Sequence, residues 1–184
     1  MPKSKNIEKK KDQVYIDIED KDPVWLKDKA DHFYKRSDYH SALNAYSKAL
    51  EYDKEFLMAR LNRATTWLKV RCFENAIEDI QDIEKVISAL KAEEREGDEF
   101  YQRMLARCHL KKGAGYAWLS KFDQAIECLQ EASKFKGVFG ERELIEILND
   151  IDRIKIRQKS ITLKADADLK FAESSIEEAT ALYE

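Results

Sequence analysis

Apolar residues recur along this chain at helical spacing, in pairs of amphipathic segments joined by short polar turns. Leu26, Ala30 and Phe33 fall on one face of a helix, and Ala42 and Tyr46 begin the same pattern again after a polar turn. Ser37-Asp38 forms that turn, with the aspartate as a candidate N-cap. The pattern predicts helices at about 23–36, 39–53, 57–70, 73–95, 99–119 and 122–135.

These paired helices form an internal repeat. Ala30 and Ala64 are 34 residues apart, and the same interval separates Ala42 from Ala76. A third copy follows after a further 49 residues, which places an insertion of 15 between the second and third copies. The insertion is strongly charged, so we expect it to lengthen the flanking helices and to leave a solvated turn near Gly97. A period of 34 residues resembles the tetratricopeptide repeat (TPR), a helix–turn–helix unit.

Residues 141–158 carry the apolar face expected of a helix that caps an open helical repeat, with Leu144, Ile147, Leu148, Ile151 and Ile154 on one side. Residues 159–184 form a further helical extension, whose final part either begins an incomplete fourth repeat or resembles one by chance. The predicted fold is therefore all-α, a TPR solenoid of three helical hairpins with a capping helix and a terminal helix. Its parts are a disordered charged tail (1–20), a TPR domain (21–158) with repeats at about 23–56, 57–90 and 106–139 and a capping helix at 141–158, and the extension (159–184).

Composition limits the possible functions. The net charge of −3 gives no general attraction to nucleic acid or anionic membrane, so we expect neither as a partner. The lysines at positions 3, 5, 9, 10 and 11 are interpreted as a solvated tail, with nuclear import or RNA contact as the alternative. Three cysteines without close pairing favour a reducing, cytosolic setting. No run of about 20 apolar residues predicts a membrane span, and no signal peptide is visible.

The sequence predicts no catalytic site, metal site or cofactor. The three histidines are scattered, and His109 and Cys108, as neighbours on a helix, point in different directions. None of the common nucleotide-binding or metal-binding motifs occurs. Cysteines and tryptophans at repeat positions are interpreted as packing residues, although Trp118 is ambiguous. We therefore expect a protein that is not an enzyme.

The TPR resemblance implies a candidate peptide-binding site. TPR domains that bind the C-terminal tails of seventy- and ninety-kilodalton heat-shock chaperones hold the terminal carboxylates with five groove residues, a carboxylate clamp. The matching positions here are Lys27, Asp31, Asn62, Arg107 and Lys111. Asp31 replaces the usual asparagine and adds a negative charge, while Arg107 and Lys111 keep the usual charge with altered geometry. The alternative interpretation is that these charges only solvate a helix face.

A closer resemblance lies in repeat one, which reads KDPVWLKDKADHF and then DYHSALNAYSKAL, and in the segments LNRA at Leu61 and NAIED at Asn75. These segments, with the enlarged connection between repeats two and three and the segment HLKKG at His109, resemble the dynein axonemal assembly factor 4 family. The resemblance covers about residues 21–135. It implies a cytoplasmic or ciliary adaptor that joins heat-shock chaperones to axonemal dynein assembly factors or dynein chains. A general co-chaperone or scaffold, or the TPR arm of a larger enzyme, remains an alternative.

Overall fold

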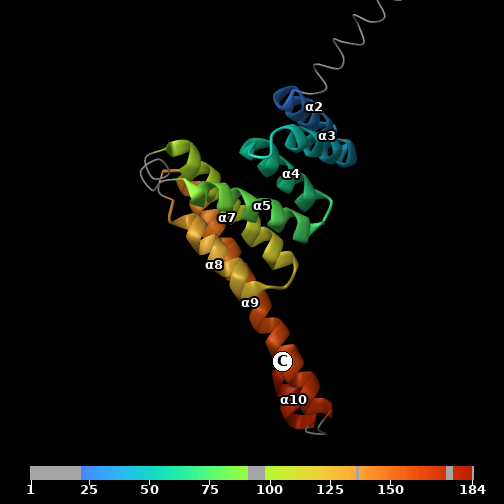
Figure 1. The fold of residues 1–184 in the computed structure, drawn as a ribbon. Coiled ribbons are helices and arrows are strands. Elements are labelled where there is room, and N and C mark those ends of the chain that lie inside the picture. The colour runs from blue at the N-terminus through green and yellow to red at the C-terminus, as the bar shows by residue number, and fades with distance from the viewer. Residues whose placement is uncertain (1–21, 91–97, 136, 173–175, 184) are drawn as a thin grey trace, which may run out of the picture. The chain divides into compact units, whose positions relative to one another are not determined.

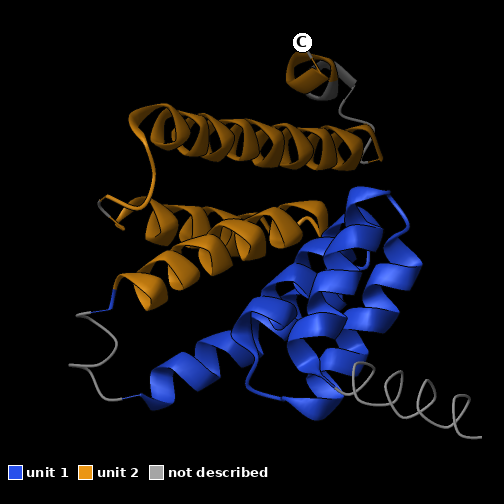
Figure 2. Ribbon diagram, turned by 90° about the horizontal axis from the view of Figure 1, so that it is seen from above, with its two compact units in different colours: residues 1–98 blue, residues 99–184 orange. Residues whose placement is uncertain are grey.

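In the computed structural model, helices joined by short turns make up the part of the chain that is described, residues 22–90, 98–135, 137–172 and 176–183. No strand occurs in these ranges, which confirms the all-α prediction. The chain forms two compact units, residues 1–98 and 99–184 (Figure 2). The predicted tail at 1–20 lies outside the described residues. Figure 1 labels the helices, which are α2 (Pro23–Lys35), α3 (Tyr39–Tyr52), α4 (Leu57–Lys69), α5 (Phe73–Ala89), α7 (Glu99–Trp118), α8 (Phe122–Ser133), α9 (Glu141–Ala172) and α10 (Ile176–Tyr183).

The described part of unit 1 forms two helical hairpins, α2–α3 and α4–α5, with α4 also packed on α3. The Asp22 side chain accepts a hydrogen bond from the Val24 amide at 2.9 Å, and Pro23 occupies the first turn, so α2 begins where the sequence provides a cap. Asp38 caps α3 in the same way, as predicted, by accepting from the Ser41 amide at 3.2 Å. The core of the first hairpin consists of Leu26, Ala30, Ala42, Tyr46, Ala49, Leu50 and Ala59.

The same backbone turn closes all three hairpins. Ser37, Arg71 and Ser120 adopt left-handed backbone angles, with φ of 62°, 64° and 58°. The amide that follows each of them donates to a carbonyl five residues earlier, as Asp38 does to Phe33 at 3.0 Å. This is the closure of a Schellman motif. Its recurrence at intervals of 34 and 49 residues confirms that the three copies are one repeated unit.

The second hairpin corrects one predicted boundary. Helix α5 ends at Ala89, six residues before the predicted end at 95, and Leu90 is extended, with ψ of 151°. Ile87 is the last buried residue of α5, and Ser88 and Ala89 after it are exposed, so little packing supports the end of this helix. The charged segment 91–97, with its expected turn at Gly97, lies outside the described residues.

Unit 2 begins with the hairpin α7–α8, in which a glycine permits close packing. A Cβ atom on Gly113 would lie 2.9 Å from Leu129 Cγ and 3.2 Å from the Ala125 carbonyl oxygen. Gly113 occupies the position of Ala64 in the previous repeat, and the absence of a Cβ atom there leaves room for Leu129. Helix α9 then covers α8, with Leu129, Ile147 and Ile151 at the centre of the contact.

The C-terminal part differs from the prediction. A single helix, α9, runs from Glu141 to Ala172, so the predicted boundary between a capping helix at 141–158 and a separate extension is not a break in the helix. The segment around Ser160 contains neither glycine nor proline, and the Thr162 hydroxyl donates to the Gln158 carbonyl at 3.1 Å within the helix. Leu148, expected on the packed face, is 53% exposed because α8 covers only the stripe through Ile147 and Ile151. The last helix, α10, packs on α9.

Candidate functional site

The first three sequence-predicted site residues meet in unit 1 around the Asp31 carboxylate. Lys27 Nζ lies 3.0 Å from Asp31 Oδ2, and the Asn62 side-chain amide donates to Asp31 Oδ1 at 2.9 Å. The Tyr46 hydroxyl donates to the same Oδ1 atom. Three donors from three helices therefore converge on one carboxylate, which is what a clamp for a ligand carboxylate requires of its donors.

Neighbouring helices supply these side chains. Lys27 and Asp31 lie one turn apart on α2, Tyr46 comes from α3, and Asn62 comes from α4, which contacts both α2 and α3. A hollow of about 250 Å³ opens beside them, lined by Asp31, Tyr34, Lys35, Tyr46, Asn62 and Thr65. The unit 1 pocket, as we call it, is thus built on packed helices rather than on loops, a rigid basis for recognition.

The surroundings of the unit 1 pocket raise the pKa values of two groups, Lys27 and Tyr46. Hydrogen bonding to Asp28, at 2.6 Å, and to Asp31 raises the pKa of the Lys27 ammonium above its usual 10.5, although partial burial opposes this. Burial, and then the hydrogen bond to Asp31, raise the pKa of the Tyr46 phenol well above its usual 10.0. Lys27 is therefore charged and Tyr46 neutral across the physiological range, so both act as donors.

The remaining two predicted residues lie in unit 2, on α7. Arg107 and Lys111 are one helical turn apart, so they share a face of that helix. Arg107 is exposed and Lys111 is half-buried. Lys111 occupies in repeat three the position that Asn62 occupies in repeat two, 49 residues earlier.

Tyr46 is a site residue that the sequence analysis treated only as part of the core. The equivalent positions in the second and third repeats are Ile80 and Leu129, both buried and apolar. A hydroxyl at this position in one repeat alone was the signal that a polar partner lay nearby. The partner could not be named from spacing, because it lies on another helix, 15 residues earlier.

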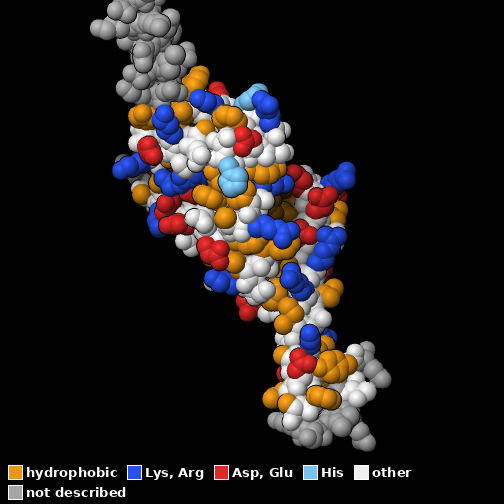
Figure 3. Space-filling model, turned by 90° about the vertical axis from the view of Figure 1, so that its right-hand side faces the viewer, with side chains coloured by type: hydrophobic (Ala, Val, Ile, Leu, Met, Phe, Trp, Pro, Cys, Tyr) orange, Lys and Arg blue, Asp and Glu red, His pale blue; other side chains and the backbone are white. Residues whose placement is uncertain are grey.

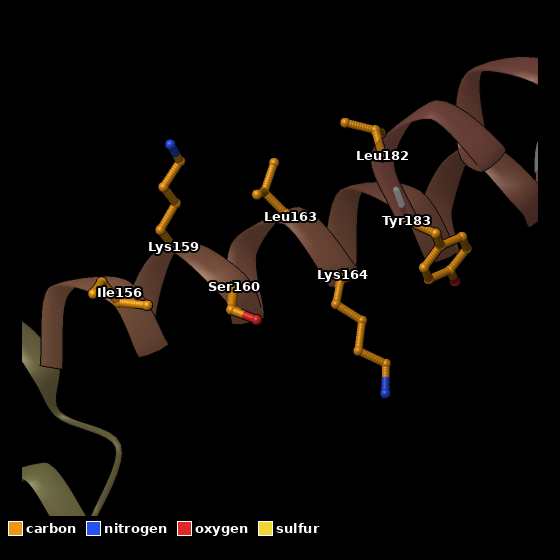
Figure 4. Close-up of a pocket in the computed structure, with 7 residues that line it drawn as sticks. All are labelled: Ile156, Lys159, Ser160, Leu163, Lys164, Leu182 and Tyr183. Atoms are coloured by element: carbon orange, nitrogen blue, oxygen red, sulfur yellow. The ribbon is translucent and has the colours of Figure 1, made fainter. Parts of the chain in front are cut away.

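A second hollow lies along the C-terminal helices of unit 2, where its lining residues come from α9 and α10 (Figure 4). Its volume is about 650 Å³, but Lys159 and Lys164 point to opposite sides of α9 in Figure 4. Its polar groups do not converge on one point, as a binding site for a small ligand would require. The unit 1 pocket, where donors do converge, is the stronger candidate.

Other kinds of site find little support in the described part of the chain. No three His, Cys, Asp or Glu side chains there are grouped so that they could hold a metal ion. On the face in Figure 3, basic and acidic side chains are interspersed rather than gathered by sign. None of the described helices has the length and apolar character that crossing a membrane requires.

Comparison with known proteins yields relatives but no matching family model. The chain is 30% identical to Hsp70-Hsp90 organizing protein 1 of Glycine max over 156 residues, 82% of this chain and 24% of that protein. It is 26% identical to dynein axonemal assembly factor 4 of Rattus norvegicus over 147 residues, 80% of this chain and 32% of that protein. The resemblance to the second protein is thereby confirmed. The chain spans about a quarter to a third of the length of these relatives.

Solved structures confirm the fold. The first TPR domain of Spaghetti (RPAP3), solved with the HSP90 peptide SRMEEVD, matches with a TM-score of 0.57 at 18% identity. The match covers 73% of this chain and 91% of that one. At this identity the likeness concerns the fold, which is that of TPR domains, as predicted from the period of 34 residues.

Proposed function

We propose that this chain is a non-enzymatic TPR adaptor that binds the C-terminal peptides of heat-shock chaperones through a modified carboxylate clamp. Its partners would be the seventy- and ninety-kilodalton classes, and Lys27, Asp31, Asn62, Arg107 and Lys111 would form the clamp. The observation that carries the proposal is the convergence of Lys27, Tyr46 and Asn62 on one carboxylate in the unit 1 pocket. These donors are of the kind that recognise polar groups at the C-terminal end of a peptide, and in the proposal Arg107 and Lys111 supply positive charge for its carboxylates.

We expect Asp31 to weaken the binding of the chaperone peptide to the clamp. Its carboxylate would face an anionic peptide, and two like charges about 4 Å apart repel by roughly 4 kcal/mol at an effective dielectric constant of about 20. Lys27 offsets part of that repulsion from 3.0 Å away. The account therefore predicts weak binding by the natural chain and tighter binding after Asp31→Asn.

Calorimetry with the peptide SRMEEVD tests the clamp. Asp31→Asn should bind the peptide about tenfold more tightly than the natural chain. Asp28→Asn is the matched control, because Asp28 also pairs with Lys27, at 2.6 Å, but its side chain is 65% exposed, whereas Asn62 and Tyr46 donate to Asp31. No heat with either the natural chain or Asp31→Asn would end the clamp proposal.

The cations of α7 need a separate test. Arg107→Ala and Lys111→Ala should each weaken binding of SRMEEVD about tenfold, since each removes a charge-assisted hydrogen bond. Lys69→Ala, an exposed lysine at the end of α4, is the control and should leave affinity unchanged. Equal effects of all three substitutions would indicate general charge attraction instead of a clamp.

For the cellular role, we propose pre-assembly of axonemal dynein arms in the cytoplasm of cells with motile cilia. The match to dynein axonemal assembly factor 4 supports this role. An affinity pull-down from ciliated cells should recover dynein heavy chains together with chaperones. Recovery of chaperones with no dynein chain would favour a general co-chaperone, the second candidate, which the match to Hsp70-Hsp90 organizing protein 1 supports.

A further inference from the structure

Asp31 occupies the position of a ligand carboxylate inside its own pocket. Its Oδ2 atom pairs with the Lys27 ammonium at 3.0 Å. Its Oδ1 atom accepts hydrogen bonds from the Asn62 amide, at 2.9 Å, and from the Tyr46 hydroxyl. Tyr46 is 1% exposed, so its hydroxyl has little freedom to turn toward another acceptor. The donors of the unit 1 pocket are therefore engaged before any ligand arrives.

We infer that Asp31 determines specificity: it makes the unit 1 pocket reject a free carboxylate and accept a neutral hydrogen-bonding group, such as a main-chain or C-terminal amide. The identity of the ligand, a peptide, rests on the proposed function. The acetate titration described below needs no peptide and so does not depend on that function. In this inference, Asp31 sets the chemical class of the group that enters this pocket, and it leaves recognition of charge to Arg107 and Lys111.

The charge balance of the pocket favours a neutral group. Among the residues that line the pocket, Lys35 carries one positive charge and Asp31 one negative charge, and the adjacent Lys27–Asp28 pair adds one charge of each sign. The pocket thus lacks the excess positive charge that would offset the loss of hydration of a carboxylate. An entering carboxylate must also displace Asp31 from its three donors or lie against it.

A neutral amide meets neither obstacle. Its N–H can donate to Asp31, whose side chain is 28% exposed and whose two oxygens offer about four acceptor sites for the three bonds described. Its carbonyl can accept from the Lys35 ammonium, which also lines the pocket. An amide therefore adds bonds while the Asp31 cluster stays intact.

A titration with acetate tests the inference without any peptide. Acetate is a free carboxylate, and the side-chain amide signal of Asn62 in nuclear magnetic resonance reports on its arrival. In Asp31→Asn, acetate should move this signal at a concentration at least tenfold lower than in the natural chain, whereas Asp28→Asn should respond less than Asp31→Asn. Equal responses of the natural chain and Asp31→Asn, both folded by circular dichroism, would overturn the inference.

A pair of peptides extends the test to the ligand. The natural chain should bind SRMEEVD with a C-terminal amide at least as tightly as the same peptide with a C-terminal carboxylate. Asp31→Asn should reverse this order and favour the carboxylate about tenfold. If the natural chain prefers the carboxylate peptide tenfold, the inference is overturned and the adaptor proposal stands. If neither peptide binds to either protein, the adaptor proposal is overturned, and the acetate titration alone decides the inference.

Discussion

Arg63 donates two hydrogen bonds to Asp79, at 2.9 Å from Nε and 2.6 Å from Nη2, and so joins α4 to α5. Arg63 also donates to the Ser47 hydroxyl on α3 at 3.0 Å, so one guanidinium connects the two hairpins of unit 1. Asp79 is only 4% exposed, and Arg60 Nη1 lies 3.8 Å from its Oδ1 atom, which Arg63 also binds. The Arg63–Asp79 pair is therefore an ionic contact whose anion is buried.

Removing Asp79 is expected to destabilise unit 1 strongly. Asp79→Ala leaves two arginines without their buried anion, and breaking such a pair lowers the free energy of unfolding by about 3–5 kcal/mol. Asp82→Ala is the control, since Asp82 is 38% exposed and binds Arg60 and Lys85 near the surface. Urea denaturation followed by circular dichroism measures both, and comparable losses would contradict the structural role given to Asp79.

The close packing at Gly113 gives a second prediction. Gly113→Ala should lower the free energy of unfolding of unit 2 by about 1–3 kcal/mol, although alanine is the better helix former. The physical reason is the Cβ atom, which would meet Leu129 Cγ at 2.9 Å. The cost should shrink when Leu129→Ala is present as well, and a double-mutant cycle measures that coupling. An unchanged cost in the Leu129→Ala background would assign the strain to another neighbour.

The left-handed turns predict a gain in stability. Ser37 holds a φ of 62°, which glycine adopts without the steric penalty of a Cβ atom. Ser37→Gly should therefore raise the free energy of unfolding by about 0.5–1 kcal/mol. Ser133→Gly, at an ordinary position in the last turn of α8, should lower it instead. Thermal unfolding of the two variants checks the difference in sign.

The Tyr46 phenol gives a dependence on pH. Its pKa is raised in the folded chain above the usual 10.0, so the unfolded chain releases this proton first as pH rises. The stability that Tyr46 contributes is thus fully present below about pH 10 and is lost as pH rises above that value, by up to about 1.4 kcal/mol per pH unit. Denaturation between pH 8 and 11 should show a steeper fall for the natural chain than for Tyr46→Phe. Parallel curves would contradict this assignment.

The sequence predicted most helix boundaries to within two residues because each hairpin repeats the same apolar and turn positions. The predicted helix ends were wrong where no residue in the local sequence marks the end of the helix. Helix α9 continues past residue 158 because nothing near Ser160 breaks it, whereas α5 stops at Ala89 because its packing ends at Ile87. The turn at Ser37-Asp38 was predicted, but its left-handed backbone was not, because Ser37 and Arg71 adopt a conformation usually given to glycine.

The candidate site could be predicted in part. The family pattern selected Lys27, Asp31 and Asn62, and these three side chains do meet in unit 1. The pattern presented Asp31 as a repulsive neighbour of the ligand, but the structure shows it as the acceptor that the donors already hold. That role depends on contacts between three helices, which no spacing along one helix reveals.

The most direct test of the proposed clamp is a titration of the isotope-labelled chain with SRMEEVD, followed residue by residue by nuclear magnetic resonance. The account predicts that signals of Asn62 and Lys27 in unit 1 and of Arg107 and Lys111 in unit 2 move together with one saturation curve. Shifts confined to α9 and α10, or no shifts at millimolar peptide, would contradict it.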